Sequence, residues 1–277
     1  MSKDFRRFIG LEDTSAKIQS LNVSQNICSP QKALYGGVGL GLAIEVLEEE
    51  YKRPIAMAST QFINQAIMDE EMSIEIQEGT SGKNFTQATA QFYQKGKLVI
   101  QTIGSLGRRD SEFNLTYNPF PADVTSPDDS VVLPKFEFMQ GYILPRMEIR
   151  HVKGPSPFMP MDPQKVPSGT ETRSLFWAKL PEYPETSAAT LAILGDIAPS
   201  VTASYIGEFA IASSLDNSMR VLNVEQCEWV LCETELHGIF NGVGQITQRM
   251  WSQQGTLMAV ASQSYILRLM NIGNFGK

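Results

Sequence analysis

Residues whose side chains could hold and activate a water molecule lie in the second half of the chain. Asp196 lies in a run, Ala188–Ala198, in which nearly every other residue is apolar or small. In a helix it would follow Ala192 by one turn and Ala189 by two, and so share their face. A carboxylate is costly to bury there without partners. Asp196 is therefore either a helix-end residue that reaches solvent or a candidate general base.

Two further candidates, Ser214 and Gln263, lie in stretches that alternate like strands. Ser214 precedes Asp216 by two residues, so in a strand both side chains would leave the same face. A hydroxyl and an amide could hold a water molecule for a carboxylate base. These residues are also typical of a solvated strand face. We interpret Asp216 as structural, as a residue that fixes a turn or a neighbouring strand.

Composition places the chain among ordinary globular proteins. It has 277 residues, of which 42% are hydrophobic and 19% are charged. This length allows one large domain or two domains of roughly 100–150 residues. The formal net charge of -7 argues against a nucleic-acid partner, because phosphate binding needs clusters of basic residues. It does not exclude an anionic small molecule such as a CoA ester.

Cysteine usage and apolar runs suggest the compartment. Cys28, Cys227 and Cys232 form an odd set with no spacing typical of disulfides or zinc, which favours a reducing environment. No apolar segment follows the first residues, and no run approaches the roughly 20 residues of a membrane helix. We therefore expect a cytoplasmic protein with no membrane partner, no metal and no cofactor.

Periodicity predicts a helix followed by an antiparallel meander in each half of the chain. In the first half the helix spans Lys32–Tyr51, after a first strand within Ala16–Ser24, and the later strands are Ile55–Asn64, Met72–Glu78, Thr86–Tyr93 and Leu98–Leu106. In the second half a short helix, Glu185–Ala198, is ended by Pro199, and the strands are Ile143–Val152, Thr172–Leu180, Ala210–Val221, Glu228–Leu236, Gly242–Trp251 and Thr256–Arg268.

The two halves align as a repeat. When Gly96 is set on Gly255 in equivalent hairpin turns, Gly104 falls opposite Gln263. When Phe62 is set on Val221, Ile55 falls opposite Ser214 and Met57 opposite Asp216. The first half is thus apolar or small where the second is polar, as expected for one functional site per double unit. We predict domains at 1–120 and 139–277, with a linker at 121–138.

Four glycines lie in the first half of the predicted helix, at positions 36, 37, 39 and 41. Each costs about 1 kcal/mol in a helix interior, so close packing of the backbone must offset them. They do not form a dinucleotide fingerprint, which would need glycine where Leu42 stands. Gly36 and Gly37 are candidates for substrate binding, since their backbone N–H groups could polarise a carbonyl. Packing of the helix on the sheet is the alternative explanation.

A helix followed by an antiparallel meander in each half of the chain resembles the double hotdog fold. Specific motifs resemble those of acyl-CoA thioesterases of the thioesterase II type. In the first half the motif is Leu34-Tyr35-Gly36-Gly37. In the second half the motifs are Leu194-Gly195-Asp196, then Ser214-Leu215-Asp216-Asn217-Ser218-Met219, and then Gln254-Gly255-Thr256-Leu257-Met258-Ala259, which is followed by Gln263.

The resemblance implies an α+β double hotdog, with two antiparallel sheets that each wrap around a central helix. It also implies hydrolysis of a fatty acyl-CoA, or a related acyl thioester, by water held by Asp196, Ser214 and Gln263. A homodimer or higher homo-oligomer is expected by the same resemblance. The chain departs from the family where Asn217 replaces a histidine and where Arg220–Asn223 replaces Trp-Phe-His-Arg. These changes bear on specificity or on whether activity is retained.

Other functions are left open by these residues. A non-catalytic acyl- or CoA-binding double hotdog protein is the main alternative, and the altered segment after Asn217 favours it. A hotdog dehydratase would need an Asp/His dyad, and neither His151 nor His237 lies in a suitable place. A serine-nucleophile mechanism is disfavoured because the Gly-x-Ser-x-Gly motif is absent.

Overall fold

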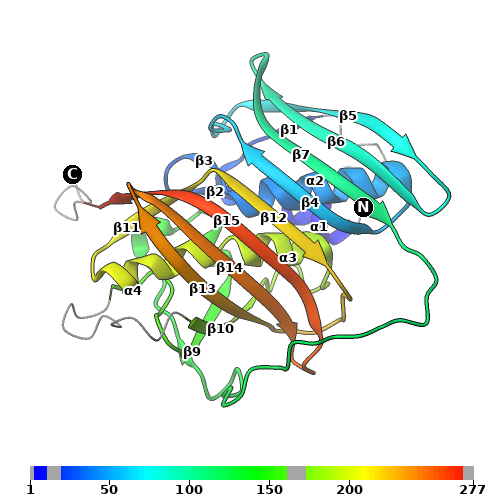
Figure 1. The fold of residues 1–277 in the computed structure, drawn as a ribbon. Coiled ribbons are helices and arrows are strands. Elements are labelled where there is room, and N and C mark those ends of the chain that lie inside the picture. The colour runs from blue at the N-terminus through cyan, green and yellow to red at the C-terminus, as the bar shows by residue number, and fades with distance from the viewer. Residues whose placement is uncertain (1–2, 11–19, 161–172, 271–277) are drawn as a thin grey trace.

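The computed structural model describes residues 3–10, 20–160 and 173–270, and it combines helices with one extensive sheet (Figure 1). The first half contains α1 (Lys3–Phe8), β1 (Ser20–Asn22), η1 (Gln25–Ile27), β2 (Cys28–Ser29), β3 (Ala33–Leu34), α2 (Gly36–Tyr51), β4 (Ile55–Phe62), β5 (Glu71–Ser81), β6 (Phe85–Gln94) and β7 (Lys97–Gly107).

The second half contains β8 (Val131–Val132), η2 (Glu137–Met139), η3 (Leu144–Arg146), β9 (Glu148–Lys153), β10 (Arg173–Lys179), α3 (Ala188–Gly195), η5 (Ala198–Val201), α4 (Thr202–Ile206), β11 (Ala210–Ser214), β12 (Asp216–Val221), β13 (Val230–Phe240), β14 (Val243–Ser252) and β15 (Leu257–Leu269). The helix-then-meander order predicted for each half is confirmed. Of the first predicted strand, residues 16–19 lie outside the described part of the chain.

Three local predictions in the second half were wrong, and the first is the strand Ile143–Val152, which begins only at Glu148 because residues 144–146 form η3. Pro199 does not end the helical segment, because it lies in the first turn of η5, where a missing N–H costs no hydrogen bond. The predicted strand Ala210–Val221 is two strands, β11 and β12, separated at Leu215. At this break Leu215 donates its N–H to Ser264 O and accepts from the Phe62 N–H, so its backbone still bonds both neighbouring strands.

Apart from the short β2–β3 pair, the described strands of both halves form one sheet, and the predicted division into two sheets is not seen among them. Its order is β1-β5-β6-β7-β4-β12-β15-β14-β13-β10-β9-β8, with β11 also paired to β15. The halves join where β4 pairs antiparallel with β12, from Gln61–Asp216 to Met57–Arg220. This pairing satisfies the backbone groups of two strands that would otherwise be exposed edges. The α+β hotdog class is confirmed, and the domain boundaries stay predictions.

The two halves are related by a constant separation along the chain. Ser59 and Ser218 face each other in the β4–β12 pair, their hydroxyl oxygens lie 2.7 Å apart, and they are 159 residues apart in sequence. The same separation relates Ile55 to Ser214, and their pairings agree: Ile55 pairs with Leu106, and Ser214 with Tyr265. The predicted repeat alignment of these strands is therefore confirmed in three dimensions.

Helices α2 and α3 pack against each other and on the sheet (Figure 1). Every residue of α2 from Gly37 to Leu47 is buried, as expected of a helix covered on all sides. A Cβ at Gly37 would lie 2.8 Å from Ala192 O, and one at Gly41 would lie 3.1 Å from Ala189 O. These glycines therefore allow close contact between two helices, where the sequence suggested contact between helix and sheet.

One segment, residues 188–206, is apolar and long enough to cross a membrane by length and composition alone. The prediction that no apolar run approaches the length of a membrane helix was therefore wrong by length and composition. In the structure the segment is divided among α3, η5 and α4, and 78% of its apolar window is buried inside the protein. The core helix of a globular domain has the same composition, and we interpret the segment in that way.

The contact between α2 and α3 predicts different effects for two alanine substitutions in the same helix. Gly37→Ala should lower the free energy of unfolding by about 1–3 kcal/mol, because its new methyl group would meet the rigid backbone of α3. Gly39→Ala is the matched control: its Cβ would meet the end of the Ile100 side chain, 2.8 Å away, which can move. Urea unfolding should give Gly39→Ala a free energy of unfolding equal to or above that of the wild type. An equal decrease in the free energy of unfolding of both variants would contradict this explanation.

Candidate active site

Asp196 is the C-cap residue of α3, and its position depends on where that helix begins. Ser187 and Thr190 form a reciprocal capping box that fixes where α3 begins. At the other end, the Asp196 carboxylate accepts two short hydrogen bonds. The Gly37 backbone N–H donates to Oδ2 at 2.8 Å, and the Gln263 amide nitrogen donates to Oδ1 at 2.6 Å.

Ser214 ends β11 at a bulge that directs its side chain towards Asp196. The pairing of β15 shifts by one residue between Ser214–Tyr265 and Ser218–Ser262, so Leu215 is the extra residue. The Ser214 hydroxyl accepts from the Gln263 amide at 2.6 Å and donates to Asp196 Oδ1 over a longer distance, 3.4 Å. Asp196, Ser214 and Gln263 are therefore brought together, as the sequence predicted.

Gln263 links the other two residues. It lies on β15 with 4% of its surface exposed, and its amide nitrogen donates to both Asp196 and Ser214. The sequence predicted that the three residues would converge on a shared water. In the structure they also bond directly to one another, so their geometry is set by the protein itself.

The environment of the Asp196 carboxyl changes its acidity. Burial raises its pKa from 3.8 to about 6, even though hydrogen bonds from Gln263, Gly37 and Ser214 stabilise the ionised form. A carboxyl with a pKa near 6 is mostly ionised at neutral pH and is a stronger base than an ordinary aspartate. This is the range in which a general base works well.

The two glycines predicted to bind substrate have different surroundings. The Gly37 N–H already donates to Asp196, so this group is not free to polarise a carbonyl. Gly36 lies directly beside the site, since a Cβ there would be 2.9 Å from Asp196 Oδ2 and 3.0 Å from the Phe62 ring. The Gly36 N–H belongs to the first turn of α2, where the helix dipole favours negative charge.

Asp216 has the structural role that the sequence suggested. It accepts a hydrogen bond of 2.8 Å from the backbone N–H of Ser264 on β15. The two histidines bond elsewhere: His151 Nε2 lies 2.8 Å from Gly154 O, and His237 Nε2 lies 2.8 Å from Thr247 Oγ1. Neither of these bonds provides Ser214 with a histidine base.

The equivalent positions in the first half form no polar site. Gly104 stands where Gln263 stands in the second half, and a Cβ there would lie 2.8 Å from Leu47 Cδ1 and 3.2 Å from Ile55 Cδ1. Leu47 and Ile55 are buried. Apolar side chains therefore fill the space in the first half that polar groups occupy in the second.

Sequence reasoning missed several buried polar residues near this site. Tyr35 lies in the aromatic-Gly-Gly motif at the start of α2, but no role was predicted for it. No role was predicted for Gln248 either. Gln248 alternates with Ile246 and Met250 on β14, and all three are buried. That pattern could have identified a polar group on the core face of a strand. Asn217 is also buried, with 2% of its surface exposed.

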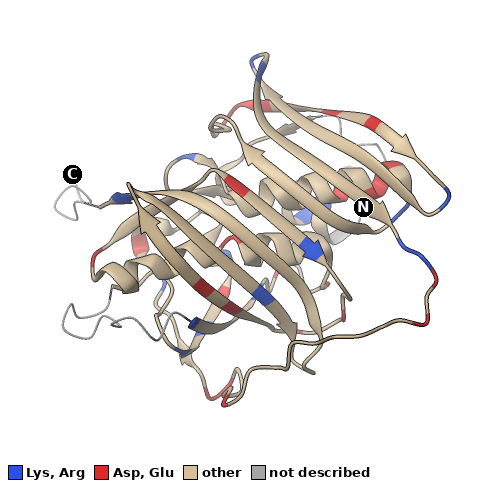
Figure 2. Ribbon diagram, viewed as in Figure 1, with Lys and Arg blue, Asp and Glu red and all other residues tan. Residues whose placement is uncertain are grey.

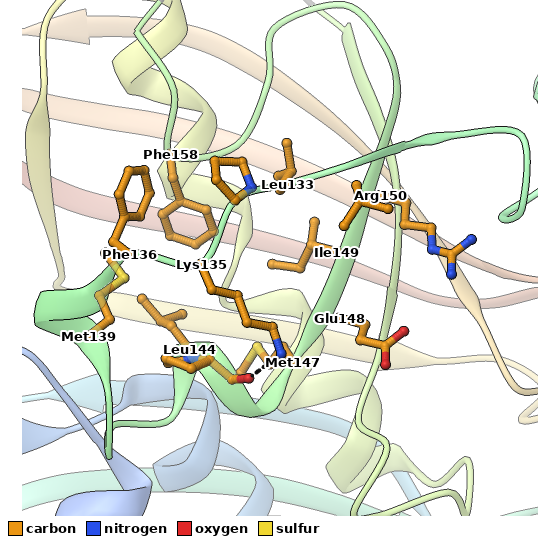
Figure 3. Close-up of a pocket in the computed structure, with 13 residues that line it drawn as sticks. Leu133, Lys135, Phe136, Met139, Leu144, Met147, Glu148, Ile149, Arg150 and Phe158 are labelled. Carbon is orange, nitrogen blue, oxygen red and sulfur yellow. Dashed lines mark hydrogen bonds between the residues drawn. The ribbon is translucent and has the colours of Figure 1, made fainter.

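A separate pocket lies on the segment that precedes β9 (Figure 3). It has a volume of about 260 Å³ and mainly apolar walls, with Leu133, Phe136 and Phe158 among its lining residues. Lys135 at its rim is held by a 2.8 Å hydrogen bond from its ammonium to Pro145 O. None of the predicted site residues lines this pocket, so it is distinct from the site around Asp196.

Comparison with known families agrees with the fold. Residues 121–267, more than half of the chain, match the family model described as the acyl-CoA thioesterase C-terminal domain. The chain therefore belongs to the acyl-CoA thioesterase II-like family. A search of curated protein sequences found no significant match.

Solved structures with the same fold cover nearly the whole chain. A candidate thioesterase from Novosphingobium aromaticivorans is 25% identical, with a TM-score of 0.78, and the match covers 92% of this chain and 97% of that one. An acyl-CoA thioesterase II from Mycobacterium marinum is 17% identical, with a TM-score of 0.70 and coverage of 96% and 99%. A hotdog-fold protein from Alicyclobacillus acidocaldarius is 16% identical, with a TM-score of 0.79 and coverage of 97% and 99%.

The raised pKa of Asp196 predicts a pH-dependent difference in stability between the wild type and Asp196→Asn. Because the folded-state pKa lies above the unfolded value of 3.8, the folded state binds the extra proton between about pH 4 and 6. The wild type should therefore lose stability relative to Asp196→Asn as pH rises through this window, by on the order of 1–3 kcal/mol, with no further change above it. Urea unfolding from pH 4 to 8 would measure this, and a constant difference would contradict the raised pKa.

Proposed function

We propose that this protein hydrolyses a fatty acyl-CoA, or a related acyl thioester, by attack of water that Asp196, Ser214 and Gln263 hold and activate. The observation that carries the proposal is the partly buried cluster in which a carboxylate, a hydroxyl and an amide lie within 2.6–3.4 Å of one another. The cluster occurs in a chain of the acyl-CoA thioesterase II-like family.

The proposed reaction is a single displacement. Asp196 removes a proton from the water as the water oxygen bonds to the thioester carbonyl carbon. The tetrahedral intermediate then breaks its carbon–sulfur bond, and the departing CoA sulfur takes the proton from Asp196. Of the three contacts, the bond from Ser214 to Asp196 is the weakest at 3.4 Å, so it is the one that an inserted water would most easily replace.

The start of α2 is suited to stabilise the negative charge that develops on the carbonyl oxygen. The Gly36 N–H lies in the first turn of a 16-residue helix, beside Asp196. Donors placed at a developing oxyanion are often the largest catalytic contribution. We assign this role to Gly36, while the Gly37 N–H orients the catalytic carboxylate.

The repeat along the chain supports a double hotdog in which both halves build one site. The first half supplies the N-terminus of α2, and the second supplies Asp196, Ser214 and Gln263. The ligand would be an acyl-CoA and not nucleic acid, since the formal net charge is -7 and the Lys and Arg positions are spread along the ribbon in the view of Figure 2. A homo-oligomer and a cytoplasmic location remain part of this proposal.

The proposal predicts that purified protein releases CoA from acyl-CoA thioesters and that Asp196→Asn lowers kcat by at least about 100-fold. The wild-type rate should rise with pH through about 6, because the ionised carboxylate is the active form. Asp216→Asn is a matched control, since Asp216 accepts a hydrogen bond from the backbone of a neighbouring strand, and it should retain activity within a few-fold. A thiol reagent would follow CoA release across acyl chain lengths.

Two results would contradict the proposal. An undiminished rate in Asp196→Asn would remove Asp196 from the chemistry. Binding of acyl-CoA without release of CoA at any chain length would favour the non-catalytic alternative. Buried Asn217, which replaces the family histidine, would then be the first residue to examine.

A further inference from the structure

A group of buried polar atoms lies without hydrogen-bond partners in the described part of the chain. They are the Tyr35 hydroxyl, the Thr234 hydroxyl and the amide oxygen of Asn217, together with the side-chain amide of Gln248, which interacts with the weakly hydrogen-bonding Cys232 thiol. The exposed fractions of these residues are 8% for Tyr35, 0% for Thr234 and 2% for Gln248. Buried polar groups in folded proteins almost always have a protein or water partner, so these atoms have bonding capacity for a bound molecule, whether water or ligand.

Three of these residues are near one another and near the site. Thr234 on β13 pairs directly with Gln248 on β14, so their side chains leave the same face of the sheet. A Cβ at Gly195, the residue before Asp196, would lie 3.6 Å from Gln248 Oε1. Tyr35 is the N-cap of α2 and directly precedes the glycines that lie against Asp196.

Electrostatics agree with this placement. Burial raises the pKa of the Tyr35 hydroxyl well above 10, and the nearby Asp196 and Cys232 raise it further. The Tyr35 hydroxyl is therefore a neutral donor and acceptor at every physiological pH. Neither ionisable neighbour supplies a positive charge, so this space suits a neutral polar group and disfavours a second carboxylate.

Other buried hydroxyls on the sheet show the contrast. The Thr60 and Thr102 hydroxyl oxygens lie 2.7 Å apart and satisfy each other. The Tyr183 hydroxyl bonds to Ser187 at 2.9 Å. The unpaired state is therefore a property of the group around Tyr35 and Gln248, and not of every buried hydroxyl in the chain.

We propose that Tyr35, Gln248 and Thr234 form a polar subsite that binds a hydroxyl or keto oxygen on the acyl group of the substrate. Together they offer both donors and acceptors, which a hydroxyl or a keto oxygen can use and a plain alkyl chain cannot. Within the proposed acyl thioesters, the preferred substrates are therefore those whose acyl group carries a hydroxyl or keto oxygen. This inference deepens the proposed function and rests on it for the position of the thioester.

Binding of two stable CoA analogues tests the subsite independently of hydrolysis. S-(4-hydroxy-2-oxopentyl)-CoA and S-(2-oxopentyl)-CoA differ by one hydroxyl group and cannot be hydrolysed as thioesters. Isothermal titration should show the hydroxylated analogue binding at least about tenfold more tightly to the wild type, since a site built to bond a hydroxyl rejects the analogue that lacks it.

Substitutions then locate the preference. Tyr35→Phe and Gln248→Met each remove polar atoms with little change in volume, and each should bring the ratio of the two affinities closer to one. Tyr183→Phe is the matched control, because it deletes a buried phenol hydroxyl that already has a partner. The control should keep the wild-type ratio.

The outcomes separate this inference from the proposed function. Equal or weaker binding of the hydroxylated analogue, or an unchanged ratio in both Tyr35→Phe and Gln248→Met, would overturn the subsite and assign its unpaired atoms to bound water. Parallel assays with 3-hydroxybutyryl-CoA and butyryl-CoA measure catalysis. Preferential binding without hydrolysis of either thioester would support the subsite while contradicting the hydrolase.

Discussion

The hydrogen bond from the Gly37 N–H to the Asp196 carboxylate is the interaction on which the rest of the site depends. It joins the first turn of α2 to the C-terminal cap of α3 at 2.8 Å. Only a residue without a side chain allows this approach, because a Cβ at Gly37 would lie 2.9 Å from Asp196 Cβ. The positive end of the α2 dipole also favours the ionised carboxylate there. The close packing of α2 on α3 and the position of the proposed catalytic carboxylate therefore depend on the same glycine.

Asymmetry between two otherwise similar halves explains why the chain has one such site. The strands of the halves pair with matching registers, including a shift next to Ile55 and one next to Ser214. In the first half that position holds an apolar side chain packed near Gly104. In the second half it holds a hydroxyl bonded to Gln263. The strands of the two halves thus keep the same pairing, and the side chains decide which half carries the polar cluster.

The sequence predicted much of this fold because alternation and hairpin turns act locally. Strand positions in both halves, and the repeat between Ile55 and Ser214, followed from such patterns. The site residues were individually ambiguous, since Gln263 alone is an ordinary strand residue, and the family resemblance resolved them. The bulge at Leu215, the joining of β4 to β12 and the use of the Gly37 N–H depend on contacts between distant segments. No local pattern encodes those contacts.

The central claim is that water, activated by Asp196, attacks the thioester directly. Single-turnover hydrolysis in ¹⁸O-labelled water, followed by mass spectrometry of the acid and of the protein, tests it most directly. The account predicts that the released acid carries one ¹⁸O after the first turnover, and that Asp196 carries none. Unlabelled acid in the first turnover, with ¹⁸O accumulating in the Asp196 carboxylate over later turnovers, would instead make Asp196 the nucleophile and contradict the account.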